Sequence, residues 1–303
     1  MSTMNRGQVC VEVALNGAWT RRVQARMPIT PDEIIAEAVA CAEAGASVVH
    51  FHAYDAASGE QTTELDVVAG ILEGIRARTD VIAYPTIRYL SNAQQIQPDA
   101  GQLRNAHVPA LAKLGLLEWL VIDPGSFNLV STRDVQQGKP GAVDINMPGA
   151  IRHALAIAAT HRLHPGLAIY EPGYLRLAAA LIGAAGDVPA PLYRLMFSDQ
   201  FTFGFPPTAL ALRAYLALLA DVAPDAPWMM AGLGVDLRAL IPLAVELGGH
   251  VRVGLEDWTL GSPDTNLDLV TQAVRQISHA GGHAASAAQV RLGLFAKPAH
   301  ALA

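Results

Sequence analysis

Charged residues are scarce in this chain of 303 residues, at 16%, whereas 51% of the residues are hydrophobic. The formal net charge is -6 and no run rich in Lys or Arg occurs, which argues against a nucleic-acid partner. Low hydrophobicity and high net charge, the marks of a disordered chain, are both missing. A chain of this length and composition buries a large core, so we expect an ordered protein.

Cysteine and long apolar runs are also lacking. Cys10 and Cys41 lie far apart, and we interpret them as two free buried thiols in a reducing cytosol rather than as a disulfide or a metal pair. No uncharged apolar stretch is long enough to cross a bilayer. The polar start, residues 1–8, and the Glu12 that follows do not fit a signal peptide. We expect a soluble, cytoplasmic protein without a membrane partner.

Short β-rich runs alternate with longer helical patterns from end to end. The first helix has the clearest signal, because Thr30, Pro31 and Glu33 form the sequence of a capping box with proline at the first helical position. The predicted strands cover residues 9–15, 47–52, 81–84, 119–122, 167–170, 192–197, 227–230 and 250–255.

Eight alternating strand–helix units imply a parallel sheet and favour closure into a (β/α)8 TIM barrel. No composition shift divides the chain, so residues 1–303 are predicted to form a single domain, with a short C-terminal helical extension at 286–294. A doubly wound open sheet is the alternative. The first strand is not followed by Gly-x-Gly-x-x-Gly, which counts against a dinucleotide fold.

His50 and His52 form a His-x-His pair at the end of the second predicted strand. The active site of a TIM barrel lies at the carboxyl ends of its strands, and residues i and i+2 of a strand point to the same side. Two imidazoles so placed bind one divalent metal. The alternative is a buried core histidine beside an incidental one.

The last predicted strand supplies partners for this pair. Glu256 has the parity of an inward residue at the rim, and two histidines with one carboxylate leave metal positions open for a substrate. Arg252 points inward and must meet a carboxylate, with Asp257 as a candidate partner and general base. Glu12, buried on the first strand, is expected to pair with Arg252 or His250. An ion pair that only supports the barrel is the alternative.

Two weaker signals lie at other strand ends. Gly232 and Gly234 either present backbone N–H groups to a cofactor phosphate or form a tight turn between strand and helix. Glu171 either orients a ligand or is a loop carboxylate in water.

Together these motifs resemble the β-keto acid cleavage enzyme family over nearly the whole chain. The most specific are His50-x-His52 and the block Gly248-Gly249-His250-Val251-Arg252-Val253-Gly254-Leu255-Glu256-Asp257. The resemblance implies a zinc-dependent barrel that reacts a β-keto acid with acetyl-CoA, giving acetoacetate and a new acyl-CoA. It also implies a homo-oligomer, a tetramer or a dimer. Supporting motifs are Asn16-Gly17-Ala18, Pro28-Ile29-Thr30-Pro31, Glu43-Ala44-Gly45-Ala46, Tyr170-Glu171-x-Gly173 and Ala231-Gly232-Leu233-Gly234.

By motif, the resemblance makes His50, His52 and Glu256 the zinc ligands and makes Arg252 and Asp257 a catalytic pair. The metal then chelates the keto oxygen and the carboxylate of the acid and polarises the carbonyl as a Lewis acid. The residues expected to bind substrate are Asn16, Trp19, Thr86, Ser126, Asn128 and Glu171, and those expected to bind the CoA co-substrate are Gly232 and Gly234.

Two departures from the family pattern bear on the substrate. Trp19 stands where the member acting on 3-keto-5-aminohexanoate has the Glu that holds the ammonium group, so that keto acid is not the expected substrate. An indole instead lines an apolar pocket or faces a quaternary ammonium. Tyr84-Pro85-Thr86 replaces the family's Ser-Thr-Gly-Gly run, and only Thr86 retains a hydroxyl for the Ser role.

Two other functions fit the same motifs. A metal-dependent TIM-barrel hydrolase of the amidohydrolase kind also uses His-x-His, but there the pair ends the first strand and further metal histidines follow. Here the pair ends the second strand and the eighth supplies Glu256. A metal-binding barrel without catalysis is disfavoured because Arg252 and Asp257 add reactive groups beside the metal.

Overall fold

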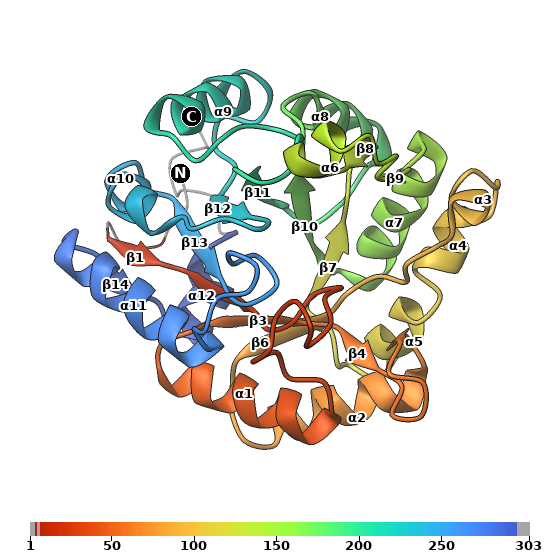
Figure 1. The fold of residues 1–303 in the computed structure, drawn as a ribbon, viewed down its shortest axis with the longest axis horizontal. Helices are drawn as coiled ribbons and strands as arrows, with labels where there is room; N and C mark the ends of the chain where they lie inside the picture. The colour runs from red at the N-terminus through yellow and green to blue at the C-terminus, as the bar shows by residue number, and fades with distance from the viewer. Residues whose placement is uncertain (1–3, 5–6, 296–303) are drawn as a thin grey trace.

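Eight parallel strands form the centre of the molecule, in the order β6-β3-β2-β13-β12-β11-β10-β7. The computed structural model describes residue 4 and residues 7–295. The outermost strands of this order, β6 and β7, lie against each other and complete a ring (Figure 1), which confirms the predicted barrel. The strands are β2 (Val11–Ala14), β3 (Val48–Phe51), β6 (Ile82–Pro85), β7 (Trp119–Ile122), β10 (His164–Ile169), β11 (Leu192–Phe197), β12 (Trp228–Gly232) and β13 (His250–Val253).

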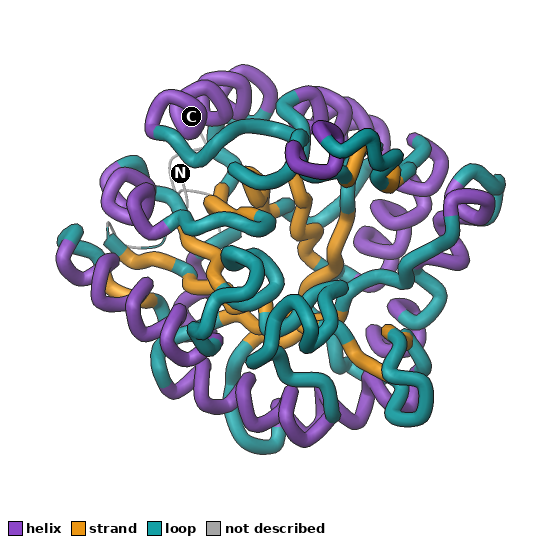
Figure 2. Tube along the Cα trace, viewed as in Figure 1, coloured by secondary structure: helices purple, strands orange, loops and turns teal. Residues whose placement is uncertain are grey.

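Helices surround the strands, as the tube in Figure 2 shows. The predicted start of α1 is confirmed: the Thr30 hydroxyl accepts the N–H of Glu33, and the Glu33 carboxylate accepts the N–H of Thr30. The helices of the ring are α1 (Pro31–Glu43), α2 (Leu65–Arg76), α5 (Val108–Lys113), α7 (Pro148–His161), α8 (Gly173–Ala185), α9 (Ala209–Val222), α10 (Ile241–Glu246) with the 3-10 turn η1 (Arg238–Leu240) before it, and α11 (Asn266–His279).

The strand register brings the charged interior residues together. Glu12 on β2 is the register partner of Arg252 on β13, and Ala14 on β2 is the partner of His50 on β3. Because side chains alternate along each strand, these residues project to the inside while Val49 and Phe51 pack into the apolar layer under the helices. The polar interior therefore lies within a continuous hydrophobic core.

Loops at the carboxyl ends of the strands carry structure that the periodicity did not predict. Two antiparallel hairpins stand there, β4 (Ala53–Tyr54) with β5 (Gln61–Thr62), and β8 (Phe127–Leu129) with β9 (Ala142–Asp144). These strands are too short to show alternation. Short helices add to the same rim: α3 (Asn92–Gln95), α4 (Ala100–Arg104) and α6 (Thr132–Gln136).

The opposite end of the barrel is closed by the C-terminal extension. Strand β1 (Gln8–Val9) pairs with β14 (His283–Ala284), so the predicted first strand is split at Cys10 between this small sheet and the barrel. Helix α12 (Ala287–Gly293) then reaches the starts of β6 and β7, where Arg291 forms ion pairs with Asp80 and Glu118. Cys10 and Cys41 are free and buried, as predicted. Within the described residues, no helix has the length and apolarity that a bilayer span requires.

Candidate active site

A pocket of about 1030 Å³, including its open mouth, lies inside the ring at the carboxyl ends of the strands. This is the face on which TIM barrels place their active sites. Six residues predicted for the site line it: Trp19, His50, His52, Thr86, Arg252 and Glu256.

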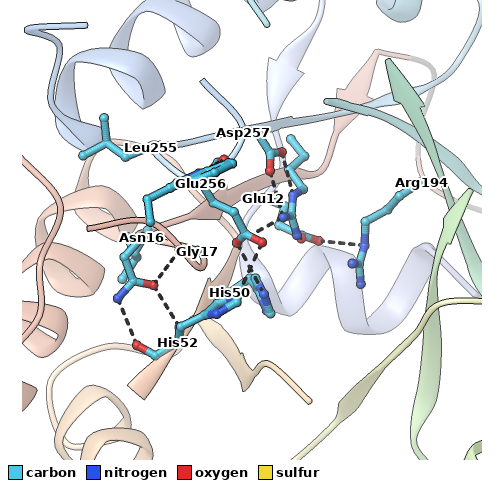
Figure 3. Close-up of polar contacts among 12 residues, drawn as sticks. Glu12, Asn16, Gly17, His50, His52, Arg194, Leu255, Glu256 and Asp257 are labelled. Carbon is cyan, nitrogen blue, oxygen red and sulfur yellow. Dashed lines mark hydrogen bonds and ion pairs between the residues drawn. The ribbon is translucent and has the colours of Figure 1, made fainter. Parts of the chain in front are cut away.

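His50, His52 and Glu256 converge on one point, and each offers a ligand atom within 4.8 Å of the others (Figure 3). The Nε2 atoms of both histidines lie 3.4 Å from the Glu256 carboxylate, which is long for a charge-assisted hydrogen bond. Bonds of 2.0–2.1 Å to a tetrahedral cation separate neighbouring ligands by about 3.3–3.4 Å. Nε2 of His52 and Oε2 of Glu256 are buried without a hydrogen-bond partner among the described residues. The three side chains therefore fit a divalent metal.

Asn16 and Gln61 hold His52 in place. The Asn16 amide donates to the carbonyls of Pro28 and His52, and its oxygen accepts the N–H groups of Gly17 and His52. Asn16 is fully buried, so its amide is committed to the protein and does not line the pocket predicted for it. Gln61 Oε1 lies 2.7 Å from His52 Nδ1, which leaves Nε2 free as the metal-binding atom.

Gly17 provides the space that Glu256 needs. Its φ is +67°, and a Cβ placed on it would lie 2.5 Å from Cγ of Glu256. Any larger residue here is therefore strained and displaces the carboxylate.

The protonation states suit a metal site. Burial lowers the pKa of His50 well below its ordinary value, so the imidazole is neutral and able to bind metal. Burial alone would raise the pKa of Glu256, but Arg252 and the two histidines lower it well below the usual range. Burial raises the pKa of Asp257, with Arg252 opposing the shift. A carboxylate whose pKa is moved toward neutrality is a suitable proton acceptor.

Arg252 is the centre of a buried ion-pair network. Its Nε and Nη2 donate to the two oxygens of Asp257 at 2.8 and 2.9 Å, and its Nη1 donates to Glu12 at 2.8 Å. Nη2 also lies 3.2 Å from Glu256, which links the network to the metal group. The hydroxyl of Tyr84 donates to Glu12 from the other side. Arg252 therefore meets both carboxylates that the sequence suggested, Asp257 and Glu12.

Trp19 and Thr86 lie on the pocket wall. The Trp19 indole N–H donates to the backbone carbonyl of Glu256 at 2.8 Å, and its ring stacks on Phe201 with centroids 6.3 Å apart. The carbonyl of Thr86 lies 3.0 Å from Nε2 of His107, which anchors this turn. Trp19 therefore forms part of the wall and also supports the strand end that carries a metal ligand.

Three other predicted substrate residues do not reach the pocket. Ser126 accepts the N–H of Asn146 at 2.8 Å and so fastens the β8–β9 hairpin, while Asn128 is exposed on the same hairpin. Glu171 is partly exposed above β10 and is not a lining residue.

Gly232 and Gly234 are buried at the end of β12, outside the pocket lining. The N–H of Leu233 between them donates to the carbonyl of Phe197. A Cβ at Gly232 would lie 2.4 Å from Val235. The segment therefore forms a tight turn whose Leu233 lines the pocket, and binding of the CoA phosphate by Gly232 and Gly234 stays a prediction.

Sequence reasoning gave no role to the wall of the pocket formed by β7, β11 and the β8–β9 hairpin, although Asp123 is among the polar residues at the predicted strand ends. Arg194 lies in the middle of β11, and Asp123 follows β7. Arg104 joins them through an ion pair with Asp144 at 3.3 Å. Burial and the nearby Asp144 raise the pKa of Asp123 to about 7, against the effect of Arg104 and Arg194. Parity along β11 would have identified Arg194, because Met196 two residues later also lines the pocket.

Comparison with known proteins decides the family. A sequence model described as beta-keto acid cleavage enzyme matches residues 8–294. The chain belongs to the β-keto acid cleavage enzyme family. This confirms the resemblance carried by the His pair and the last strand.

Similar curated proteins cover nearly the whole chain. The 3-oxoadipate:acetyl-CoA acetyltransferase of Cupriavidus necator is 29% identical over 291 residues, 94% of each chain. The 3-dehydrocarnitine:acetyl-CoA trimethylamine transferase of Rhizobium meliloti is 28% identical over 95% of this chain and 96% of that protein. The solved complex of ObcA with oxaloacetate has a TM-score of 0.68 at 19% identity, over 89% of this chain and 67% of that one. At that identity the likeness supports the barrel fold alone.

Proposed function

We propose that this chain is a zinc-dependent enzyme that exchanges acyl groups between a β-keto acid and acetyl-CoA. The observation that carries the proposal is the junction of a metal-binding group, His50, His52 and Glu256, with the buried Arg252–Asp257 pair, in a member of this family. Two curated relatives are named for acetyl-CoA-dependent reactions of 3-oxo and 3-dehydro acids.

The overall exchange balances without an oxidant or water. The bond between the keto carbon and C2 of the β-keto acid breaks, and the acyl group R–CO becomes bonded to the sulfur of CoA. C2, with its carboxylate, becomes bonded to the acetyl group and leaves as acetoacetate. Condensation with acetyl-CoA and a retro-Claisen cleavage together produce this result.

Asp257 and Arg252 are proposed to handle the proton and the developing charge. Asp257 is held by two hydrogen bonds from Arg252, and its raised pKa suits it to accept a proton from C2. Arg252 is positively charged at all relevant pH values and lies 3.2 Å from Glu256, close to the metal group. It can stabilise negative charge that develops on a substrate oxygen there.

His50, His52 and Glu256 would hold the zinc, with Gln61 and Asn16 fixing His52. A bound zinc would supply Lewis-acid polarisation of the keto group. Trp19, Phe127 and other apolar side chains line the remaining wall, consistent with a pocket that excludes water from the reacting atoms.

The test is acetoacetate release from a panel of β-keto acids, with and without acetyl-CoA. We expect release that requires acetyl-CoA and is matched by an equal amount of new acyl-CoA. Turnover without acetyl-CoA would contradict the proposal and favour the hydrolase. Light scattering of the same zinc-loaded protein checks the predicted tetramer or dimer.

Two sets of variants separate the metal group from the ion pair. The double variant His50→Ala, His52→Ala is expected to lose stoichiometric zinc, measured by atomic absorption. Asp257→Asn and Arg252→Ala are expected to retain zinc but to lose nearly all turnover. Retained zinc in the double variant would refute the metal assignment, and near-normal turnover in the other two would show that the pair only supports the barrel.

A further inference from the structure

Asp123 is a carboxyl group of the pocket wall that has no hydrogen-bond partner. It follows β7, lines the pocket and is partly buried. Among the described residues its side chain forms neither a hydrogen bond nor an ion pair. The neighbouring Asp144 differs, because Arg104 and Asn146 donate to its two oxygens at 3.3 and 2.7 Å. Removing a carboxyl group from water without giving it a donor is costly, so a donor on a bound ligand is favoured here.

The cations of the pocket do not neutralise Asp123. Arg104 is paired with Asp144. Arg88 and Arg194 also line the pocket, but within the described part of the chain neither forms an ion pair with Asp123, and Arg88 is exposed. Burial and Asp144 raise the pKa of Asp123 to about 7, against the effect of Arg104 and Arg194. The protonated and the ionised form therefore both occur near neutral pH.

The hydroxyl of Tyr170 is a second polar group of this wall without a partner. Tyr170 follows β10, which pairs with β7, and it lines the pocket. Its ring stacks on Phe127 with centroids 4.2 Å apart and meets Phe203 edge-on, which fixes the position of the hydroxyl. In the structure as described, the hydroxyl is hydrogen-bonded neither to Asp123 nor to another residue. Burial, and next the charge of Asp123, raise the pKa of Tyr170 well above its ordinary value, so the hydroxyl keeps its proton.

Asp123 and Tyr170 thus present one acceptor and one donor to the same part of the pocket. A hydroxyl can donate to Asp123 and accept from Tyr170, whereas an ammonium group cannot accept and a carboxylate cannot donate. A methyl group can do neither. Much of the wall around the two residues is apolar and is formed by Val121, Phe127, Leu129, Ala168 and Met196.

The ring of strands places this wall opposite the proposed catalytic residues. In the closed order of eight strands, β7 lies across from β13, which carries Arg252 and is followed by Glu256 (Figure 1). A β-keto acid held at the metal group by its keto oxygen and carboxylate has the β7 side of the pocket for its acyl chain. We infer that Asp123 and Tyr170 select a β-keto acid that carries a hydroxyl on this chain, a step that rests on the proposed function.

The experiment measures kcat/KM of the zinc-loaded enzyme with acetyl-CoA for two matched pairs of acids. The first pair is 5-hydroxy- and 5-methyl-3-oxohexanoate, and the second is 7-hydroxy- and 7-methyl-3-oxooctanoate. In at least one pair we expect the wild type to prefer the hydroxy acid about 10- to 100-fold, because the methyl analogue leaves both polar groups unpaired. Asp123→Leu is expected to abolish this preference and Tyr170→Phe to reduce it about 5- to 10-fold.

Tyr174→Phe is the matched control. It removes a buried hydroxyl that also has no hydrogen-bond partner among the described residues but does not line the pocket, so the preference should stay at the wild-type value. Tyr170→Phe removes a single oxygen atom and guards against a folding defect in Asp123→Leu. Zinc content, measured by atomic absorption, should be the same in all variants.

A wild type without preference in either pair would refute the inference, as would an unchanged preference in both Asp123→Leu and Tyr170→Phe. A third result would also overturn it: 5-amino-3-oxohexanoate is preferred to the hydroxy acid and Asp123→Leu removes that preference, since Asp123 would then bind a cation. Failure of the proposed function is distinct. No acid is then consumed with acetyl-CoA, while calorimetric titration of the zinc-loaded enzyme with each pair still measures the preference for the hydroxyl.

Discussion

Glu12→Gln is the sharpest test of the buried network, because it removes one charge and almost no volume. The carboxylate is fully buried and lies 2.8 Å from Arg252 and 3.7 Å from Arg194. At an effective dielectric constant of about 20, these two attractions amount to about 6 and about 4.5 kcal/mol. The cost of burying the carboxylate, several kcal/mol, offsets part of them.

We expect Glu12→Gln to lower the free energy of unfolding by about 3–5 kcal/mol, the usual loss when one partner of a buried ion pair is removed. For a chain of this size that is a decrease in Tm of about 10 °C. The glutamine oxygen can keep the hydrogen bonds from Tyr84 and Arg252. The decrease in unfolding free energy therefore measures the removal of the negative charge and not the loss of these hydrogen bonds.

Thermal and urea unfolding of the zinc-loaded protein measure the effect. Asp187→Asn is the matched control, since it makes the same chemical change in the pair with Arg162, where the Asp187 side chain is 92% exposed. Exposed pairs contribute little, and we expect no measurable change there. Equal effects in the two variants, or a Glu12→Gln protein as stable as wild type, would refute the argument that Glu12 holds two buried cations.

Three further predictions concern single side chains. Asn16→Ala is expected to weaken zinc binding about 10- to 100-fold, because the backbone of His52 loses the hydrogen bonds that hold it. A competition titration with a chelator measures the zinc affinity, and an unchanged affinity would contradict this role of Asn16. Burial lowers the pKa of His107 to about 4, so its contribution to stability is complete above pH 6.5 and is lost as the pH falls from there toward 4. His107→Gln can still donate a hydrogen bond to Thr86 but cannot take up a proton, so its Tm should decrease less than that of the wild type between pH 6.5 and 4. If Tm depends on pH in the same way in both proteins, His107 does not make this contribution. Thr30→Ala is expected to lower the free energy of unfolding by about 1 kcal/mol, because α1 loses its N-terminal cap. Thermal unfolding followed by circular dichroism measures the change, and a curve that matches the wild type would contradict the prediction.

Alternation along a strand is a local property, and it explains which site residues the sequence revealed. His50 and His52 share parity at the end of their own strand, so their common direction could be predicted before any strand was placed beside another. Glu256 lies in the turn after β13, where alternation no longer applies, and the contacts place it beside the histidines. Arg194 follows the same rule but lies in the middle of β11, where a search limited to strand ends does not reach.

Gln61 and Asp144 could not be predicted in this way. Each reaches the pocket from a hairpin of two or three residues per strand, and such strands are too short for a periodic pattern. Asn16 is a different case, because the sequence placed it correctly at a strand end but predicted that it binds substrate. Only the contacts show that its amide is hydrogen-bonded to the backbone of His52 and of neighbouring residues. The helix starts were predictable because a capping box depends on residues three apart.

The hydrogen bond from Trp19 to the carbonyl of Glu256 has a consequence for altering this enzyme. The side chain at position 19 is a natural target for changing which acids the pocket accepts, since it lies on the wall. Yet the same indole steadies the backbone of a metal ligand. A change in substrate range made at Trp19 therefore also disturbs the metal group, and variants selected for a new acid would need a compensating donor to the Glu256 carbonyl before they regained full turnover.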